Sequence, residues 1–169
     1  GEGGLRDAGV DVDLEFDFRD LAGLARLVHA PRAWSGALQG RLDLQGSADA
    51  PSGVLSLSGR EVVAAGLELG EVVARADVDR ERLRVETFRS RGRAGSVEAG
   101  GSYEFASATL SDVRIAQDVP DLAALSAGRL DEGSLALRAR LSGTPADPSG
   151  TLELDARGLG GSALAGRRL

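Results

Sequence analysis

The sequence predicts a mainly β protein built as an elongated sheet of meandering strands. The segment Val10–Phe18 alternates strictly between apolar and acidic residues, which is the pattern of a strand with one apolar and one solvated face. The 169 residues include 24 glycines and five prolines, and such frequent interruption is typical of many short strands joined by turns. A peptide pattern at Gly46–Gly59 also returns at Gly143–Ala156 without a gap, which indicates a repeated unit.

The first strand is followed by a short predicted helix. Asp20 is a suitable N-cap, and apolar residues follow it at the helical positions Leu21, Leu24, Ala25 and Val28. Pro31 ends this helix at about Ala30. We expect its apolar stripe to cap the sheet locally or to lie across the outside.

Further alternating segments bring the expected total to about ten strands. They are the ranges 38–44, 53–59, 62–64, 69–78, 83–88, 96–103, 109–115 and 135–141, and the strand of the second repeat around 152–154. The alternation breaks within Leu83–Phe88, so the sequence leaves open which side chains there face inward. Two short helices cannot cover so much apolar strand surface. The sheet must therefore curl onto itself or stay open as a groove.

The chain divides into two similar modules. The segment Asp121–Leu125 resembles Asp20–Leu24 and predicts a second short helix, and the strands after it repeat the earlier pattern. We interpret residues 1–169 as a single segment of a longer protein, with one module at about 10–107 and an incomplete one at 108–169. Repetition of this kind marks an elongated architecture in which neighbouring units cover each other.

The composition excludes several classes of function. A formal net charge of −6 and few aromatic residues argue against nucleic-acid binding. There is no cysteine and His29 is the single histidine, so we expect no metal site, no cofactor and no nucleophilic catalysis. We expect no enzymatic activity.

Two charged clusters favour a solvated outer face over a binding site. The carboxylates of Asp11, Asp13, Glu15 and Asp17 would stand about 6.6 Å apart in a line, a spacing that does not converge on a calcium ion. A basic cluster could meet lipid phosphates or an acidic partner, but pairing with Glu81 and Glu86 is the simpler interpretation. This cluster consists of Arg80, Arg82, Arg84, Arg89, Arg91 and Arg93.

The ordered series of motifs resembles one known family. The peptides "GRLDLQGSADAPSGVLSL" and "LALRARLSGTPADPSGTLEL" share alternating leucines, a short turn and a Pro-x-Gly, and "DLAGL" or "DLAAL" precedes each of them. From Val10 to Ala156 the chain resembles the repeat regions of the TamB and AsmA-like proteins of the Gram-negative cell envelope.

This resemblance implies a β-taco, which is an antiparallel sheet curled into a U-shaped trough with an apolar lining and two short helices. It also implies an inner-membrane anchor elsewhere in the full-length protein, with this segment soluble in the periplasm. The family is implicated in lipid transport and outer-membrane biogenesis. The resemblance to TamB, part of the translocation and assembly module, further implies an outer-membrane barrel partner.

The expected function is passive conduction of phospholipid acyl chains along an apolar groove toward the outer membrane. An alternative is a scaffold for assembling outer-membrane proteins or autotransporters, using an open sheet edge and a barrel partner. A second alternative is the β-solenoid stalk of an adhesin, whose interior would be packed. We expect the groove lining to consist of Val10, Val12, Leu14, Phe16, Phe18, Leu42, Leu44, Leu55, Leu57, Val72, Val78, Leu83, Val85, Leu135, Leu137, Leu152 and Leu154.

Overall fold

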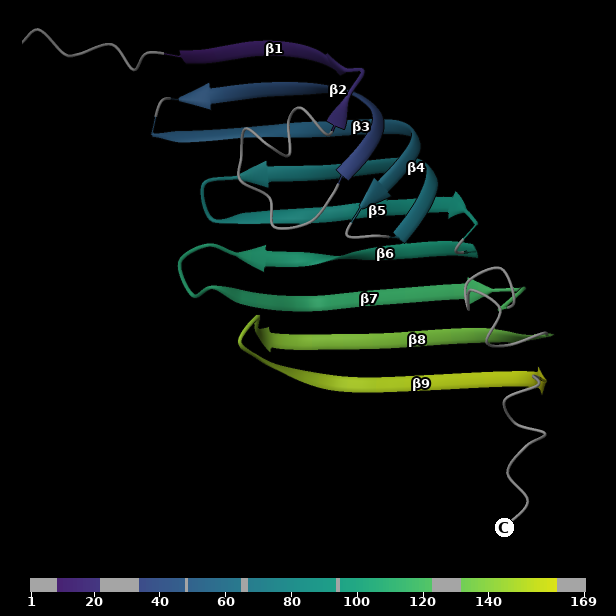
Figure 1. Cartoon of the computed structure of the whole chain (residues 1–169). Coiled ribbons are helices and arrows are strands. Elements are labelled where there is room, and N and C mark those ends of the chain that lie inside the picture. The colour runs from purple at the N-terminus through teal and green to yellow at the C-terminus, as the bar shows by residue number, and fades with distance from the viewer. Residues whose placement is uncertain are drawn as a thin grey trace, which may run out of the picture.

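Nine strands form a single antiparallel sheet in which each strand pairs with its neighbours in chain order (Figure 1). The computed structural model describes residues 9–21, 34–47, 49–64, 67–93, 95–122 and 132–160. The strands are β1 (Gly9–Phe18), β2 (Trp34–Ser47), β3 (Ala50–Ala64), β4 (Leu67–Asp79), β5 (Arg82–Gly92), β6 (Gly95–Glu104), β7 (Thr109–Val119), β8 (Glu132–Thr144) and β9 (Asp147–Gly160). The mainly β, antiparallel prediction is confirmed.

Two finer expectations concern the predicted helices and the short strand at Val62–Ala64. The predicted helices, Asp20–Ala30 and the one beginning at Asp121, lie mostly in ranges 22–33 and 123–131, outside the described residues; every regular element within the described ranges is a strand. The prediction of a separate short strand at Val62–Ala64 is wrong, because these residues continue β3.

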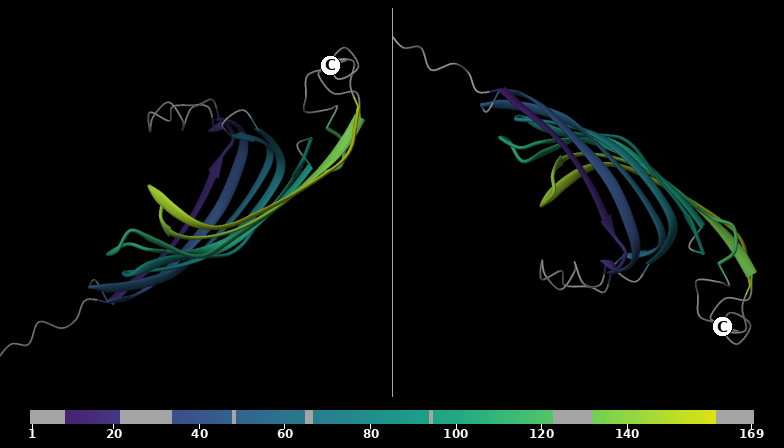
Figure 2. Two further views of the ribbon diagram at one scale, coloured as in Figure 1. Left: turned by 90° about the horizontal axis from the view of Figure 1, so that it is seen from below. Right: turned by 90° about the horizontal axis from the view of Figure 1, so that it is seen from above.

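The sheet is open, since β1 and β9 lie at opposite edges and do not pair. It twists and bends, so that the bowed strands β2–β4 run at an angle to β9 in both views of Figure 2. Register shifts occur near the bent ends, and Gly36, Glu61 and Gly70 have positive φ there. Bulges of this kind bend a strand and increase its twist. Closure into a U-shaped trough remains a prediction.

A small hydrophobic cluster lies under the bent ends. Leu21, Val62 and Val72 are buried, and partly buried side chains of β1, β2, β4 and β5 pack against them. These are Phe18, Leu38, Leu69 and Phe88. Burying an aliphatic side chain contributes roughly 1.5–3 kcal/mol relative to leaving it exposed. The cluster therefore fixes the bend locally.

The repeated peptide builds the same hairpin twice. In β2–β3, Gly46 pairs with Pro51; in β8–β9, the equivalent Gly143 pairs with Pro148. Both glycines have positive φ, at 120° and 97°. In each turn a hydroxyl oxygen accepts a backbone hydrogen bond: Ser47 Oγ from Ala50 N at 3.2 Å, and Thr144 Oγ1 from Asp147 N at 3.1 Å.

Candidate functional site: an apolar sheet face

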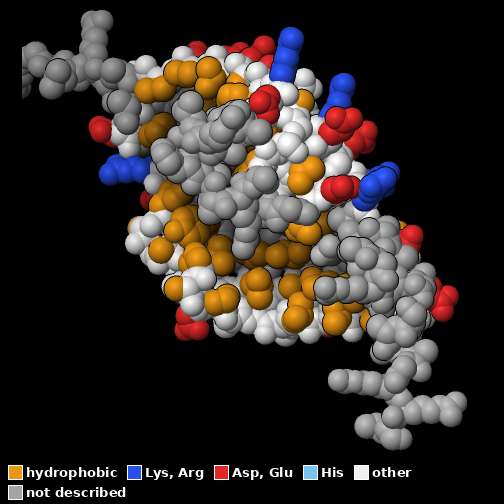
Figure 3. Space-filling view, viewed as in Figure 1, with side chains coloured by type: hydrophobic (Ala, Val, Ile, Leu, Met, Phe, Trp, Pro, Cys, Tyr) orange, Lys and Arg blue, Asp and Glu red, His pale blue; other side chains and the backbone are white. Residues whose placement is uncertain are grey.

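One face of the sheet is apolar across all nine strands. Side chains alternate between faces along a strand, and directly paired residues of antiparallel neighbours share a face. One row of direct pairs crosses the whole sheet, from β1 to β9, in the order Phe16, Gly40, Leu57, Ala74, Phe88, Ala99, Ile115, Ala139 and Leu152. Figure 3 shows hydrophobic side chains gathered on the face turned to the viewer, with charged side chains around the rim.

The register brings every residue of the expected lining onto this apolar face. Val12, for example, pairs with Leu44 and Leu14 pairs with Leu42. The same holds at the other edge, where Leu137 pairs with Leu154. A second row of direct pairs also crosses all nine strands, in the order Phe18, Leu38, Gly59, Val72, Ser90, Val97, Gln117, Leu137 and Leu154. Two residues of this row, Ser90 and Gln117, are polar.

Bulges explain why part of this face was missing from the expected lining. Val85 pairs with Ala76 and Phe88 pairs with Ala74, so β5 has one extra residue between them. The bulge puts Val85 and Phe88 on the same face although their numbers differ in parity, and this settles the orientation that the sequence left open. A second shift follows Leu110 of β7. Other lining residues missed were Leu38, Ala74, Ala76, Val97, Ala99, Tyr103, Val113, Ile115, Ala139, Leu141 and Ala156.

Much of the apolar face is not covered by the protein's own described side chains. Leu152 and Leu154 on β9 are 66% and 62% exposed. On β1, Leu14 is 50% exposed and Val12 44%. These exposed apolar side chains thus lie at the two edges of the face, and a group of exposed apolar side chains is a candidate binding surface.

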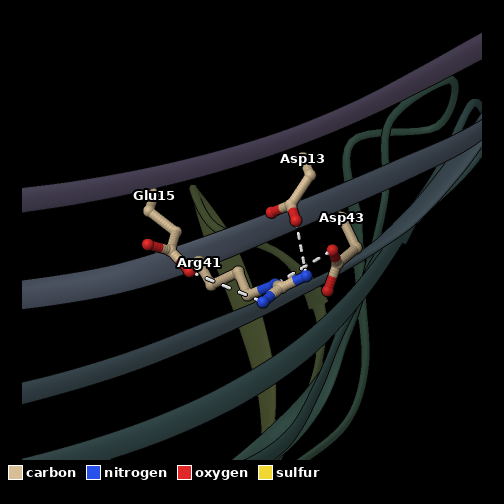
Figure 4. Close-up of polar contacts among 4 residues, drawn as sticks. All are labelled: Asp13, Glu15, Arg41 and Asp43. Atoms are coloured by element: carbon tan, nitrogen blue, oxygen red, sulfur yellow. Dashed lines mark hydrogen bonds and ion pairs between the residues drawn. The ribbon is translucent and has the colours of Figure 1, made fainter.

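The opposite, polar face carries the acidic residues of β1. The guanidinium group of Arg41 on β2 lies between two carboxylates of β1, those of Asp13 and Glu15, and the carboxylate of Asp43 on its own strand (Figure 4). Its nitrogens are 2.5 Å from Asp13, 3.5 Å from Glu15 and 3.1 Å from Asp43. The hydrogen bond to Asp43 and the charge of Asp13 raise the pKa of Arg41 above its ordinary value. The acidic row is thus partly neutralised by an arginine of the next strand.

Three of the six arginines in the basic cluster have acidic partners, and these are not the expected ones. Arg82 pairs with Asp79 at 3.5 Å and Arg89 with Glu98 at 3.2 Å. Arg93 pairs with Glu68 at 3.9 Å, while Arg80 donates to the Asp49 carbonyl at 3.1 Å. The expected pairing with Glu86 is wrong, because Glu86 pairs with Arg75 of β4 at 3.0 Å. Cross-strand register places these partners, and the sequence order does not reveal it.

The described residues hold no cluster of histidine and carboxylate side chains placed for a metal ion. Within the described ranges, no helix that is long and apolar enough to cross a membrane is found. What the site offers chemically is a broad apolar surface on one side and ion-paired side chains on the other.

These features define a class: an open antiparallel meander with one apolar and one polar face. Comparison with known proteins adds no family, since no family model, no curated protein and no solved structure matches this chain.

Proposed function

We propose that this chain is a non-enzymatic segment of a TamB/AsmA-like, inner-membrane-anchored protein that conducts phospholipid acyl chains through the periplasm toward the outer membrane. The observation that carries the proposal is the unbroken apolar row from Phe16 to Leu152, with exposed leucines at the β9 edge. Eight strand spacings of about 4.8 Å make this face roughly 38 Å long across the strands.

Moving a phospholipid through the periplasm would expose its acyl chains to water, which costs free energy. At about 0.8 kcal/mol per CH₂, a chain of roughly 16 carbons costs on the order of 12 kcal/mol when it leaves a bilayer. Contact with a continuous apolar face offsets most of this cost at every point. Passive sliding needs no specific recognition, which fits a lining of Val, Leu, Ala and Phe side chains.

The trough is part of the same proposal. The ends of β2, β3 and β4 bend so that Val62 and Leu69 pack with Val72 and Phe88 of the apolar face. Continued bending along further modules would enclose a lipid tail on three sides and leave its polar head group in water.

One observation favours a second function, a scaffold for outer-membrane proteins acting with a barrel partner. Strands β1 and β9 each leave one edge unpaired by any described strand. Such an edge can accept an extended client strand by backbone hydrogen bonding. The β-solenoid adhesin stalk has no comparable support, because a simple antiparallel meander is not a stack of solenoid coils.

Site-specific photo-crosslinking in cells tests the proposal. We expect photoreactive residues at Leu14, Leu44 and Leu152 on the apolar face to capture phospholipid. The matched controls are the sequence neighbours Glu15, Gln45 and Glu153, whose side chains lie on the polar face. Lipid mass spectrometry of the purified chain should detect co-purified phospholipid.

The two functions give different products. Lipid adducts confined to the apolar positions support conduction, and adducts with outer-membrane proteins support the scaffold. Equal lipid capture from both faces, or none from either, would contradict the proposed conduction.

A further inference from the structure

The polar face contains a pair of adjacent arginines that form no ion pair with any described carboxylate. Seven of the 14 described arginines have an ion-pair partner within 4 Å, as Arg41, Arg75 and Arg89 do. Arg114 on β7 and Arg140 on β8 have no ion pair with any described residue. These two differ from the other arginines without an ion pair because they lie directly opposite each other, in a chain whose net charge is −6.

The two arginines are direct cross-strand partners. Paired residues in an antiparallel sheet have Cβ atoms about 4.5–5.5 Å apart, and like charges at this spacing destabilise the pair. Their other neighbours in the same row are Gly100 on β6 and Thr151 on β9, neither of which carries a charge. The repulsion is thus unrelieved along the row.

A third arginine adds to the positive charge. Arg138 on β8 lies on the same face, two residues before Arg140, and its partner on β7 is the small residue Ala116. Glu153 of β9 lies opposite Arg138 and offsets part of its charge. No such carboxylate faces Arg114 or Arg140 directly.

The pair lies between two hollows in the polar face. One, of about 500 Å³, extends over Gly100 and Ala116 to Arg84 and Arg138. The other, of about 240 Å³, is lined by Arg114, Arg140 and the hydroxyl residues Ser142 and Thr151. Small side chains leave the guanidinium groups accessible, and hydroxyls add further hydrogen-bond donors.

Carboxylates near the larger hollow are mostly engaged elsewhere. Glu86 accepts a hydrogen bond from Arg75, and Glu98 pairs with Arg89. Asp112 lines both hollows. Among the carboxylates that line the larger hollow, only Asp112 has no ion pair, and it lies there with Arg84, Arg114, Arg138 and Arg140. Outside the hollow, Asp77 lies opposite Arg84 and Glu153 lies opposite Arg138.

We propose that Arg114 and Arg140 form a binding site for a phosphate group on the polar face. A guanidinium presents paired N–H donors that match phosphate oxygens, and a bound anion relieves the repulsion between two adjacent guanidinium groups. The phosphate belongs to a lipid head group or to a free phosphate compound. This site is on the face opposite the proposed acyl-chain surface. A failed test of the phosphate site would therefore leave the proposed lipid conduction unaffected, and the reverse also holds.

Titration of the purified chain with inorganic phosphate at low ionic strength tests the site. We expect saturable binding by isothermal titration and a phosphate-dependent rise in Tm. Arg114→Gln combined with Arg140→Gln should weaken binding about tenfold or more, since charge-assisted hydrogen bonds are lost. Arg41→Gln is the matched control: Arg41 also lies on the polar face but is surrounded by carboxylates, so phosphate binding should be unchanged.

Vesicles distinguish the two sources of phosphate. Co-flotation with phosphatidylglycerol-containing vesicles that the double variant loses, and that Arg41→Gln keeps, assigns the site to a lipid head group. If the wild type binds inorganic phosphate, but the wild type and the double variant co-float equally with vesicles, the site is assigned to a free phosphate compound. An equal phosphate-induced Tm rise in the wild type and the double variant, or no rise in either, overturns the proposal.

Discussion

At the residue scale, Gly40 shows how the apolar face accommodates an aromatic side chain. A Cβ atom at this position would lie 2.5 Å from Phe16 Cζ, 2.7 Å from Leu57 Cδ2 and 2.8 Å from the Ser56 carbonyl oxygen. Phe16 on the edge strand therefore covers a glycine on its neighbour. Such cross-strand cover helps to pin the register of an edge strand.

Gly40→Ala is expected to destabilise the protein by about 1–3 kcal/mol, because overpacking forces Phe16 and Leu57 to move. Thermal unfolding measures the effect. Gly9→Ala is the control, since the nearest atom to its Cβ would be 3.9 Å away. Equal melting of wild type and Gly40→Ala would show that Phe16 does not rest on this glycine.

Asp79 shows how a polar residue fixes a turn between β4 and β5. Its Oδ1 accepts hydrogen bonds from the backbone N–H groups of Glu81 at 2.8 Å and Arg82 at 2.9 Å. These bonds hold the pKa of Asp79 below its ordinary value.

A group whose pKa is lowered by folding stabilises the protein above its unfolded-state pKa and loses this contribution as the pH falls through the folded-state pKa. Asp79→Ala should therefore lower Tm at neutral pH, and the difference from wild type should narrow in acid. Melting curves across this pH range give the measurement. A difference that stays constant into strong acid would mean that the carboxylate charge is not involved.

At the element scale, the bulge in β5 decides which side chains line the apolar face. Glu86 and Thr87 lie between Val85 and Phe88, so the strand keeps both apolar residues inward by adding one residue. A regular strand with this sequence would send one of the two to the polar face.

Deleting Glu86 should leave the fold intact, because Val85, Thr87 and Phe88 then alternate regularly against β4. The deletion loses the ion pair with Arg75, so a small fall in Tm is expected. Deleting Arg84 should be far more damaging, since it places Val85 on the polar face and Glu86 on the apolar face. Circular dichroism and thermal melting compare the two, and similar damage from both deletions would contradict this account of the bulge.

At the scale of the whole molecule, the apolar face is broad and only partly buried. Six apolar side chains are buried among the described residues, and three of them lie near the bent ends of the strands. Toward β9 the same face is open, with Leu152 and Leu154 among the most exposed apolar side chains described. A face left open in this way is available to a ligand.

Leu152→Glu with Leu154→Glu should leave Tm nearly unchanged, because these side chains gain little burial on folding. It should reduce the fluorescence of a bound hydrophobic dye and the amount of co-purified lipid. Asp155→Gln with Arg157→Gln serves as the control, because both residues lie on the polar face of the same strand and outside the proposed phosphate site. A large loss of stability in the leucine variant would mean that β9 packs against further protein.

Part of the apolar face could be predicted from particular residues. Val10, Leu14 and Phe18 alternate with carboxylates, so their common face followed from the period of two alone. Phe88 and Leu110 could not be placed, because a bulge changes the parity of a strand without leaving a mark in its composition. The partners of Glu86 and Arg89 were also inaccessible, because cross-strand neighbours are set by register.

The sequence by itself determined that this protein is a β protein with one apolar and one polar face, since alternation is a property of each strand taken separately. It also determined the repeated hairpin, because the same turn residues demand the same local backbone. Only the tertiary structure decided the order of the strands, the bulges and the open outline of the sheet. These depend on which strands pair and in which register, and many pairings of alternating strands satisfy the same local pattern.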